Sequence, residues 1–118
     1  MIIETKDHDG IINEDEKTQS NLMLAESFLN NAEITDQALD YLSGVHKLYG
    51  DFHTKNNQFE RAERHFNEAL DLAQKVYGNQ PSRDRGKIYI SLGQLYSRQH
   101  KFNEALHTFN RAIQSVLP

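Results

Sequence analysis

The sequence predicts an all-α fold of about five helices, arranged as antiparallel pairs that stack on one another. Three observations lead to this prediction. The chain of 118 residues carries an internal repeat, and within each repeat the apolar side chains recur every three or four residues. Its hydrophobic content of 37% is low for a compact sphere but typical of stacked repeats, which bury only the seam between neighbouring helices.

The internal repeat becomes visible when the chain is shifted against itself by 43 residues, which brings Gly50 onto Gly93. The same shift, after a short gap, brings Phe66 onto Phe109. Other aligned pairs are Val45 with Ile88, Tyr49 with Leu92, Ala62 with Ala105 and Ala69 with Ala112. Small residues align with small ones and aromatic residues with aromatic ones, so the two segments are expected to fold alike.

The second half of each repeat carries large and small apolar side chains at helical spacing. In the first repeat these are Phe59, Ala62, Phe66, Ala69, Leu70 and Ala73, and in the second they are Phe102, Ala105, Phe109, Ala112, Ile113 and Val116. Such spacing places one apolar stripe along a helix. A small alanine lets a neighbouring helix approach closely, and an aromatic side chain fills the remaining gap.

The first half of each repeat is also expected to be a helix, over roughly residues 35–54 and 84–98. Gly50 and Gly93 lie inside these two helices. Glycine inside a helix costs about 1 kcal/mol relative to alanine. We therefore expect close contact with a neighbouring helix at both glycines.

Capping residues mark the helix boundaries. Thr35 is a candidate N-cap for the first helix of the first repeat. Asn57 followed by Glu60 is typical of a capping box at the start of the next helix. Gly78 and Pro81 follow that helix, and glycine suits the residue past a helix end whereas proline stops continuation. These signals separate the second helix of the first repeat from its neighbours.

The repeated residues resemble the tetratricopeptide repeat, whose pattern is a large residue, then Leu-Gly, then Tyr, then Ala, Phe and Ala at fixed offsets. The second repeat matches with Tyr89, Leu92, Gly93, Tyr96, Ala105, Phe109 and Ala112. The first matches more loosely, with His46, Tyr49, Gly50, His53, Ala62, Phe66 and Ala69. The usual period is 34 residues, and the longer offset here is similar to that of kinesin light chains. The resemblance covers roughly residues 44–118 and implies a short right-handed solenoid.

The predicted organisation follows from these boundaries. Residues 1–17 form a polar, acidic N-terminal segment that we expect to be disordered. Residues 18–118 form the helical domain, with a first repeat over 35–77 and a second over 84–118. The stretch 18–32 is either a partial repeat or a capping helix, since its apolar spacing fits both.

Composition restricts the class of partner. With 17 acidic and 13 basic residues, the chain has a formal net charge of −4, which argues against nucleic-acid binding. No stretch approaches the roughly 20 apolar residues that span a bilayer, and no signal-peptide run is present. Cysteine is absent, which fits a reducing compartment. We therefore expect a cytoplasmic protein that binds neither nucleic acid nor membrane.

The resemblance implies a module that binds a peptide or helix of another protein on the concave face, which the first helices line. The predicted partner-binding residues on that face are Lys47, Asp51, Thr54, Lys55, Lys87, Ile90, Gln94, Ser97 and Arg98. Four of them are basic and one is acidic, so we expect an acidic or mixed partner segment. An ordinary solvated face is an equal alternative.

Catalysis and cofactor binding are not expected. The sequence has no Gly-rich phosphate loop and no cysteine nucleophile. His46 and His53 fall at aromatic core positions of the repeat, so we interpret them as core residues and expect no metal site there.

Two alternative functions remain from the sequence. The chain could self-associate through exposed apolar seams, either at Ile113, Val116 and Leu117 or at Leu22 and Phe28. It could also respond to calcium through residues 5–16, which resemble an EF-hand loop with Asp7, Asp9, Gly10 and Glu16 in place. Thr5 stands where that loop needs its first aspartate, and no entering helix precedes it.

Overall fold

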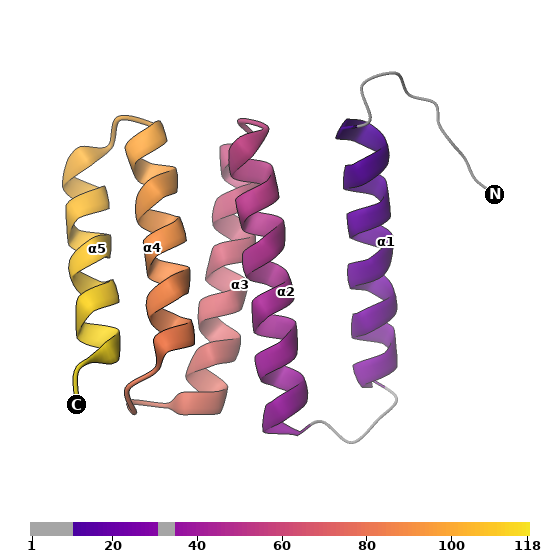
Figure 1. The fold of residues 1–118 in the computed structure, drawn as a ribbon. Helices are drawn as coiled ribbons and strands as arrows, with labels where there is room; N and C mark the ends of the chain where they lie inside the picture. The colour runs from indigo at the N-terminus through magenta and orange to yellow at the C-terminus, as the bar shows by residue number, and fades with distance from the viewer. Residues whose placement is uncertain (1–10, 31–34) are drawn as a thin grey trace. The chain divides into compact units, whose positions relative to one another are not determined.

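The structure, a computed structural model, describes residues 11–30 and 35–118. These residues form five α-helices and no strand, which confirms the all-α prediction. The helices are α1 (Ile11–Asn30), α2 (Asp36–Lys55), α3 (Phe59–Tyr77), α4 (Arg83–Arg98) and α5 (Phe102–Val116) (Figure 1). The chain divides into two compact units, Met1–Ile34 and Thr35–Pro118.

The first unit contains α1, which begins at Ile11 rather than near Thr18. Residues 11–17, which we expected to be disordered, are therefore helical. Whether α1 acts as a partial repeat or as a cap stays a prediction.

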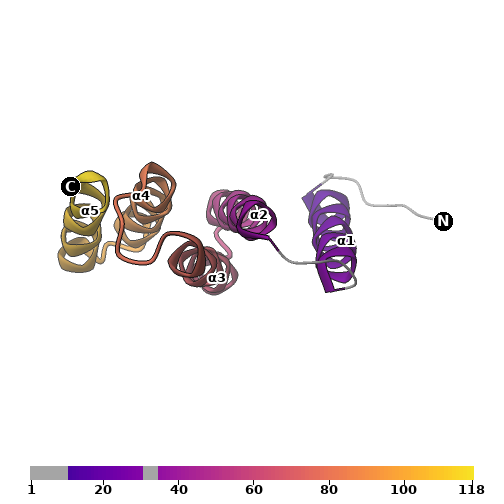
Figure 2. The ribbon, with the colours of Figure 1, turned by 90° about the horizontal axis from the view of Figure 1, so that it is seen from below.

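The second unit contains the two repeats, each an antiparallel helix pair. In the first repeat α2 packs on α3, in the second α4 packs on α5, and α3 and α4 join the pairs. Seen end on in Figure 2, α3 lies to one side of the line between α2 and α4. The two first helices therefore share a face of this unit, which is the arrangement that the repeat pattern predicts.

Hydrogen bonds confirm one predicted cap and reveal another. The Thr35 hydroxyl accepts a hydrogen bond from the backbone N–H of Ala38 at 3.1 Å, as an N-cap should. The Ser82 hydroxyl caps α4 in the same way, accepting from the N–H of Arg85 at 3.0 Å. Gly78 ends α3 with a positive φ of 58°, a conformation that glycine adopts without strain.

The predicted capping box at Asn57 and Glu60 is wrong. The N-cap of α3 is Gln58, and its side chain makes no capping hydrogen bond. Asn57 instead has a φ of 60°, in the left-handed region that asparagine tolerates better than most residues. His100, which aligns with Asn57 across the repeat, has a φ of 62°. In both helix pairs the turn thus contains a left-handed residue at the same aligned position. This residue follows the end of the first helix and does not cap the second.

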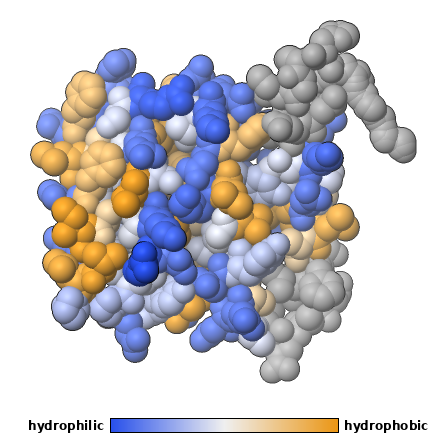
Figure 3. Space-filling model, in the orientation of Figure 1, coloured by the Kyte–Doolittle hydropathy of each residue, from blue (hydrophilic) through white to orange (hydrophobic). Residues whose placement is uncertain are grey.

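The core confirms the close approach expected at the two glycines. A Cβ atom built on Gly50 would overlap the ring of Phe66, and one on Gly93 would lie 2.5 Å from Cε1 of Phe109. The seam between the repeats is filled by buried apolar residues of α3 and α4, namely Ala62, Phe66, Ala69, Ala73, Ile88, Leu92 and Leu95. Apolar side chains also remain on the surface over α4 and α5, at the edge of the molecule in Figure 3.

Candidate partner-binding face

A groove runs between α2 and α4 and encloses about 740 Å³. Its lining is Lys47, Leu48, Asp51, Phe52, Thr54, Lys55, Ser91, Gln94 and Arg98. We call this surface the partner groove. It brings together six of the nine residues named from the sequence, because α2 and α4 present the same helical face to it. Lys87, Ile90 and Ser97 are the three that do not line it.

Three lining residues of the partner groove were not predicted. Leu48 and Phe52 lie one helical turn apart on α2, and Ser91 lies on α4. Phe52 aligns with Leu95, which is a buried core residue of the second repeat. Leu48 aligns with Ser91, so the large apolar side chain had no counterpart to mark it. Leu48 and Phe52 add an apolar surface to a site that we had expected to be dominated by charge.

The charge of the partner groove is more balanced than the sequence suggested. The Lys47 ammonium forms an ion pair with the Asp51 carboxylate at 2.8 Å, one helical turn away. Both side chains are partly exposed, so this pair contributes at most about 0.5 kcal/mol to stability. Asp51 therefore offsets the charge of Lys47. The remaining positive charge lies toward one end, at Lys55 and Arg98.

Two predicted residues already have structural roles. Thr54 is buried, and its hydroxyl donates to the backbone oxygen of Gly50 at 2.8 Å. That hydroxyl hydrogen is therefore not free for a partner. The Arg98 guanidinium donates to Oδ1 of Asn57 at 2.9 Å, which ties the end of α4 to the turn of the first repeat. The exposed Arg98 keeps further donors for a partner, since a guanidinium has five.

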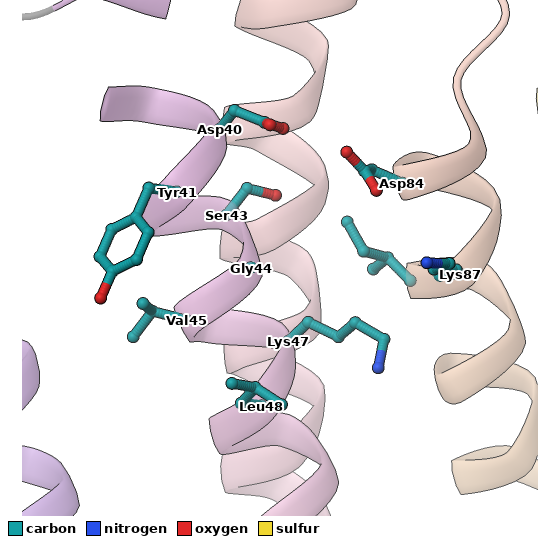
Figure 4. A pocket seen from close by; sticks show the side chains of 10 residues that line it. Asp40, Tyr41, Ser43, Gly44, Val45, Lys47, Leu48, Asp84 and Lys87 are labelled. Atoms are coloured by element: carbon teal, nitrogen blue, oxygen red, sulfur yellow. The ribbon is translucent and has the colours of Figure 1, made fainter. Parts of the chain in front are cut away.

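A smaller pocket of about 360 Å³ lies beside the first half of α2 and α4 (Figure 4). Its lining includes Lys47 and Lys87, which extend into the space between the two helices from opposite sides. Lys87 thus lies near the partner groove although it does not line it. Ile90 instead lines a groove on the far side of α4, against α5, and Ser97 is half-buried.

One tyrosine connects three helices at the head of this smaller pocket. The Tyr77 hydroxyl of α3 lies 2.9 Å from Oδ1 of Asp40 on α2 and 3.1 Å from Oδ2 of Asp84 on α4. Burial, followed by the hydrogen bonds to the two carboxylates, raises the pKa of Tyr77 well above its ordinary value. The phenol stays protonated as a donor and fixes the spacing of α2 and α4. No sequence signal marked this contact, because the three residues belong to three different helices.

A second tyrosine joins the repeats on the opposite side of the seam. The Tyr96 hydroxyl donates to Oε2 of Glu63 at 2.8 Å. Burial and this hydrogen bond raise the pKa of Tyr96 from 10.0 to about 12. Both shifted phenols therefore act as ties between helices.

The histidines of the first repeat occupy the core, as predicted for His46 and His53, which are both buried. His65 of α3 joins them: its Nδ1 lies 3.0 Å from Nδ1 of His46, and its ring stacks on that of His53 at 5.3 Å. Nδ1 of His53 lies 2.6 Å from Oε1 of Gln58. Within residues 16–26 and 35–118, no group of three or more histidine or carboxylate side chains is arranged to hold a metal ion.

The structure describes the EF-hand-like stretch and the two apolar seams only in part. Of the EF-hand-like stretch, residues 5–10 lie outside the described part of the chain, and residues 11–16 belong to α1. Of the apolar seams, Ile113, Val116 and Leu117 are exposed. Leu22 is buried, so the prediction that it is exposed is wrong, and the side chain of Phe28 lies outside the described residues.

Comparison with known proteins agrees with the repeat architecture. Among the described residues, no helix is long and apolar enough to cross a membrane. No curated protein and no solved structure matches the chain.

The profile of the tetratricopeptide repeat matches residues 41–116, which include all of α3, α4 and α5 and most of α2. With its two glycine–phenylalanine contacts and its paired helices, the chain belongs to the tetratricopeptide repeat family.

Proposed function

We propose that this protein is a non-catalytic interaction module that holds a segment of another protein in the partner groove. Tetratricopeptide repeats generally serve as protein-binding modules, and this family membership supports the coarser part of the proposal. The observation that carries the finer part is the composition of the groove, which combines exposed apolar side chains with cationic groups at one end.

The apolar part of the partner groove would supply most of the contact energy. Leu48 is 65% exposed, and Phe52 beside it is half-buried. An exposed leucine next to a partly exposed aromatic ring gains from being covered, at about 25 cal/mol for each Å² of apolar surface removed from water. We therefore expect the partner to place an apolar side chain against these two residues.

The charged part would set the orientation of the partner. Lys55 and Arg98 lie exposed at the same end of the groove, whereas Asp51 offsets Lys47 near its middle. A carboxylate of the partner is best placed near Arg98, since a guanidinium binds carboxylates through paired hydrogen bonds. The proposed partner is therefore a mixed segment, with an apolar residue followed or preceded by an acidic one.

A non-catalytic role fits the state of the titratable groups. Tyr77 and Tyr96 have raised pKa values in the described part of the chain, and each phenol stays neutral while it bonds to carboxylates of other helices. The hydrogen bonds of these two phenols stabilise the packing of helices. An active site instead tends to place a shifted group where it can reach a substrate in a cleft.

The proposal is tested by capturing partners from native lysate with three forms of the chain. The forms are wild type, Lys55→Glu/Arg98→Glu, and the control Arg64→Glu/Lys75→Glu, which makes the same change in net charge on α3 outside the groove. Equal helicity of all three is checked first by circular dichroism.

A protein that wild type and the control retain, and that the groove variant loses, would support the partner groove as its binding site. Retention that also weakens as salt increases would support the charged contact at Arg98. A protein that all three forms retain equally binds elsewhere, and that result would overturn the proposal.

A further inference from the structure

A second groove, between α4 and α5, is almost entirely apolar and encloses about 490 Å³. We call it the end groove. Its lining is Arg83, Gly86, Lys87, Ile90, Phe109, Ala112, Ile113 and Val116. Ile90, Ile113 and Val116 are all substantially exposed, and Ile113 is 57% exposed. A continuous apolar groove of this kind is costly in water and commonly marks an interaction site.

The first repeat shows what such a groove accommodates. The end groove corresponds, across the repeat, to the surface that α2 and α3 present to α4 inside the chain. Phe109 corresponds to Phe66, Ala112 to Ala69, Ile113 to Leu70 and Val116 to Ala73. In the first repeat this surface is covered by α4, whose Ile88 and Leu95 are buried in the same core cluster as Phe66 and Ala69. The occupant of the equivalent end groove is therefore expected to be a helix with the apolar pattern of α4.

Helix α2 carries that pattern on an exposed face. It is the repeat equivalent of α4, and Val45, Leu48 and Phe52 correspond to Ile88, Ser91 and Leu95. The α4 residues at these positions are buried, whereas Leu48 is exposed and Val45 and Phe52 are half-buried. Tyr41, one turn before Val45, is 68% exposed. The second unit thus presents an apolar groove on α4 and α5 and, on α2, the repeat equivalent of the helix that covers such a groove inside the chain.

We propose that α2 of one copy fills the end groove of a second copy, so that the chains join head to tail. The polar residues at the rim are compatible with this arrangement. Inside the chain, Asp40 and Asp84 come close enough to share the Tyr77 hydroxyl. In the proposed contact, Arg83 of one copy stands at the position of Asp40, and Tyr41 of the other copy stands at the position of Asp84. The two carboxylates are thus replaced by a cation and an aromatic ring, which attract each other.

The proposed contact differs from partner binding in symmetry and in salt dependence. Each copy uses one surface at each end, so the contact is heterologous and can extend beyond two chains. Its centre is apolar, so it persists as salt increases, whereas charge-steered binding in the partner groove weakens. The self-association goes beyond the proposed function and can be tested without knowing any partner. Because Leu48 and Phe52 belong to both surfaces, a segment bound in the partner groove would compete with it.

The test measures sedimentation velocity of the full chain over a wide range of concentration. Wild type is compared with Ile113→Glu in the end groove, Leu48→Glu on α2, and the control Leu106→Glu. Leu106 is 63% exposed on α5 but does not line the end groove, so this control adds the same charge to the same helix. Because all three leucine or isoleucine side chains are exposed, each variant is expected to keep the helicity and melting temperature of wild type.

We expect the mass of wild type and Leu106→Glu to rise with concentration beyond two chains, and Ile113→Glu and Leu48→Glu each to stay monomeric. Mixing the two monomeric variants should restore a pair and no larger species, since only one intact α2 face and one intact end groove remain to meet. Wild type that stays monomeric at the highest concentration would overturn the proposal. So would a mixture that stays monomeric, or a Leu106→Glu control that associates as poorly as Ile113→Glu.

Discussion

The two repeats share one backbone plan but differ in what fills it. In both, a glycine of the first helix contacts a phenylalanine ring of the second, at Gly50 and Phe66 and again at Gly93 and Phe109. The first repeat places His46 and His53 where the second places Tyr89 and Tyr96. The comparison teaches that the contact between a glycine and a phenylalanine ring keeps the same two residue types in both repeats, whereas the neighbouring ring positions hold either histidine or tyrosine.

The largest expected difference between the repeats is in the stability that each phenylalanine contributes. Phe66 is fully buried between two repeats, whereas Phe109 is half-buried beside the end groove. We expect Phe66→Ala to cost about 4 kcal/mol of unfolding free energy and Phe109→Ala roughly half as much, because less buried surface is lost. Urea denaturation followed by circular dichroism would measure both. Equal costs would show that the end groove is as well covered as the seam.

The two glycines come next. Gly50→Ala and Gly93→Ala should each destabilise by about 2 kcal/mol, because the added methyl overlaps a phenylalanine ring and forces it to move. Gly44 is the matched control, since it lies in α2 with no atom within 4 Å of a Cβ built there. Gly44→Ala should stabilise by up to about 1 kcal/mol through helix propensity. Thermal melts of the three variants give the order, and a stabilising Gly50→Ala would contradict the close contact.

Tyr96 makes the stability of the second repeat depend on pH in the alkaline range. Its pKa is 10.0 ordinarily and about 12 when folded, so the unfolded chain loses this proton first as pH rises. The contribution of Tyr96 is fully present below pH 10 and is lost between about pH 10 and 12. Tyr96→Phe should cost about 1 kcal/mol at neutral pH for the lost hydrogen bond to Glu63.

Denaturation midpoints of Tyr96→Phe at neutral pH and between pH 10 and 12 would check this contribution. The variant should lose less stability than wild type across that alkaline range. Parallel pH profiles for the two proteins would contradict the role of the Tyr96 phenol.

The smallest difference concerns the charged pair of the partner groove. Lys47 and Asp51 form an ion pair in the first repeat, and the aligned positions in the second are Ile90 and Gln94. Lys47→Met should destabilise by about 0.4 kcal/mol at low salt and by less at high salt, because the pair is partly exposed. Urea titration at two salt concentrations measures both values. If the loss of stability does not change with salt, it comes from packing of the Lys47 side chain and not from the ion pair.

Much of the fold could be predicted because it depends on contacts that are local or repeated. The apolar spacing predicted α2 to α5, Thr35 predicted its own capping bond, and the aligned glycines predicted the close helix contacts. The capping box failed because Asn57 could serve either as a cap or as a left-handed residue, and the need for a tight turn selected the second. The early start of α1 was missed because polar composition was read as disorder.

The partner groove was predicted only in part, for a related reason. Helical periodicity places Lys47, Lys55 and Arg98 on one face, and the structure does bring them to one groove. The same periodicity does not show that the Thr54 hydroxyl bonds to the backbone or that Asp51 pairs with Lys47. It also could not reveal that Leu48 and Phe52 contribute an apolar surface, since that depends on how α2 and α4 approach each other.

The sequence by itself determined the helices, their pairing and the family, because these follow from periodicity and from small residues that allow close approach. Only the tertiary structure decided which side chains share a groove. Tyr77 sets the spacing of α2 and α4 through Asp40 and Asp84, three residues that no local pattern connects. Spacing between helices results from many contacts distant in sequence, whereas helix formation depends on neighbours within a turn or two.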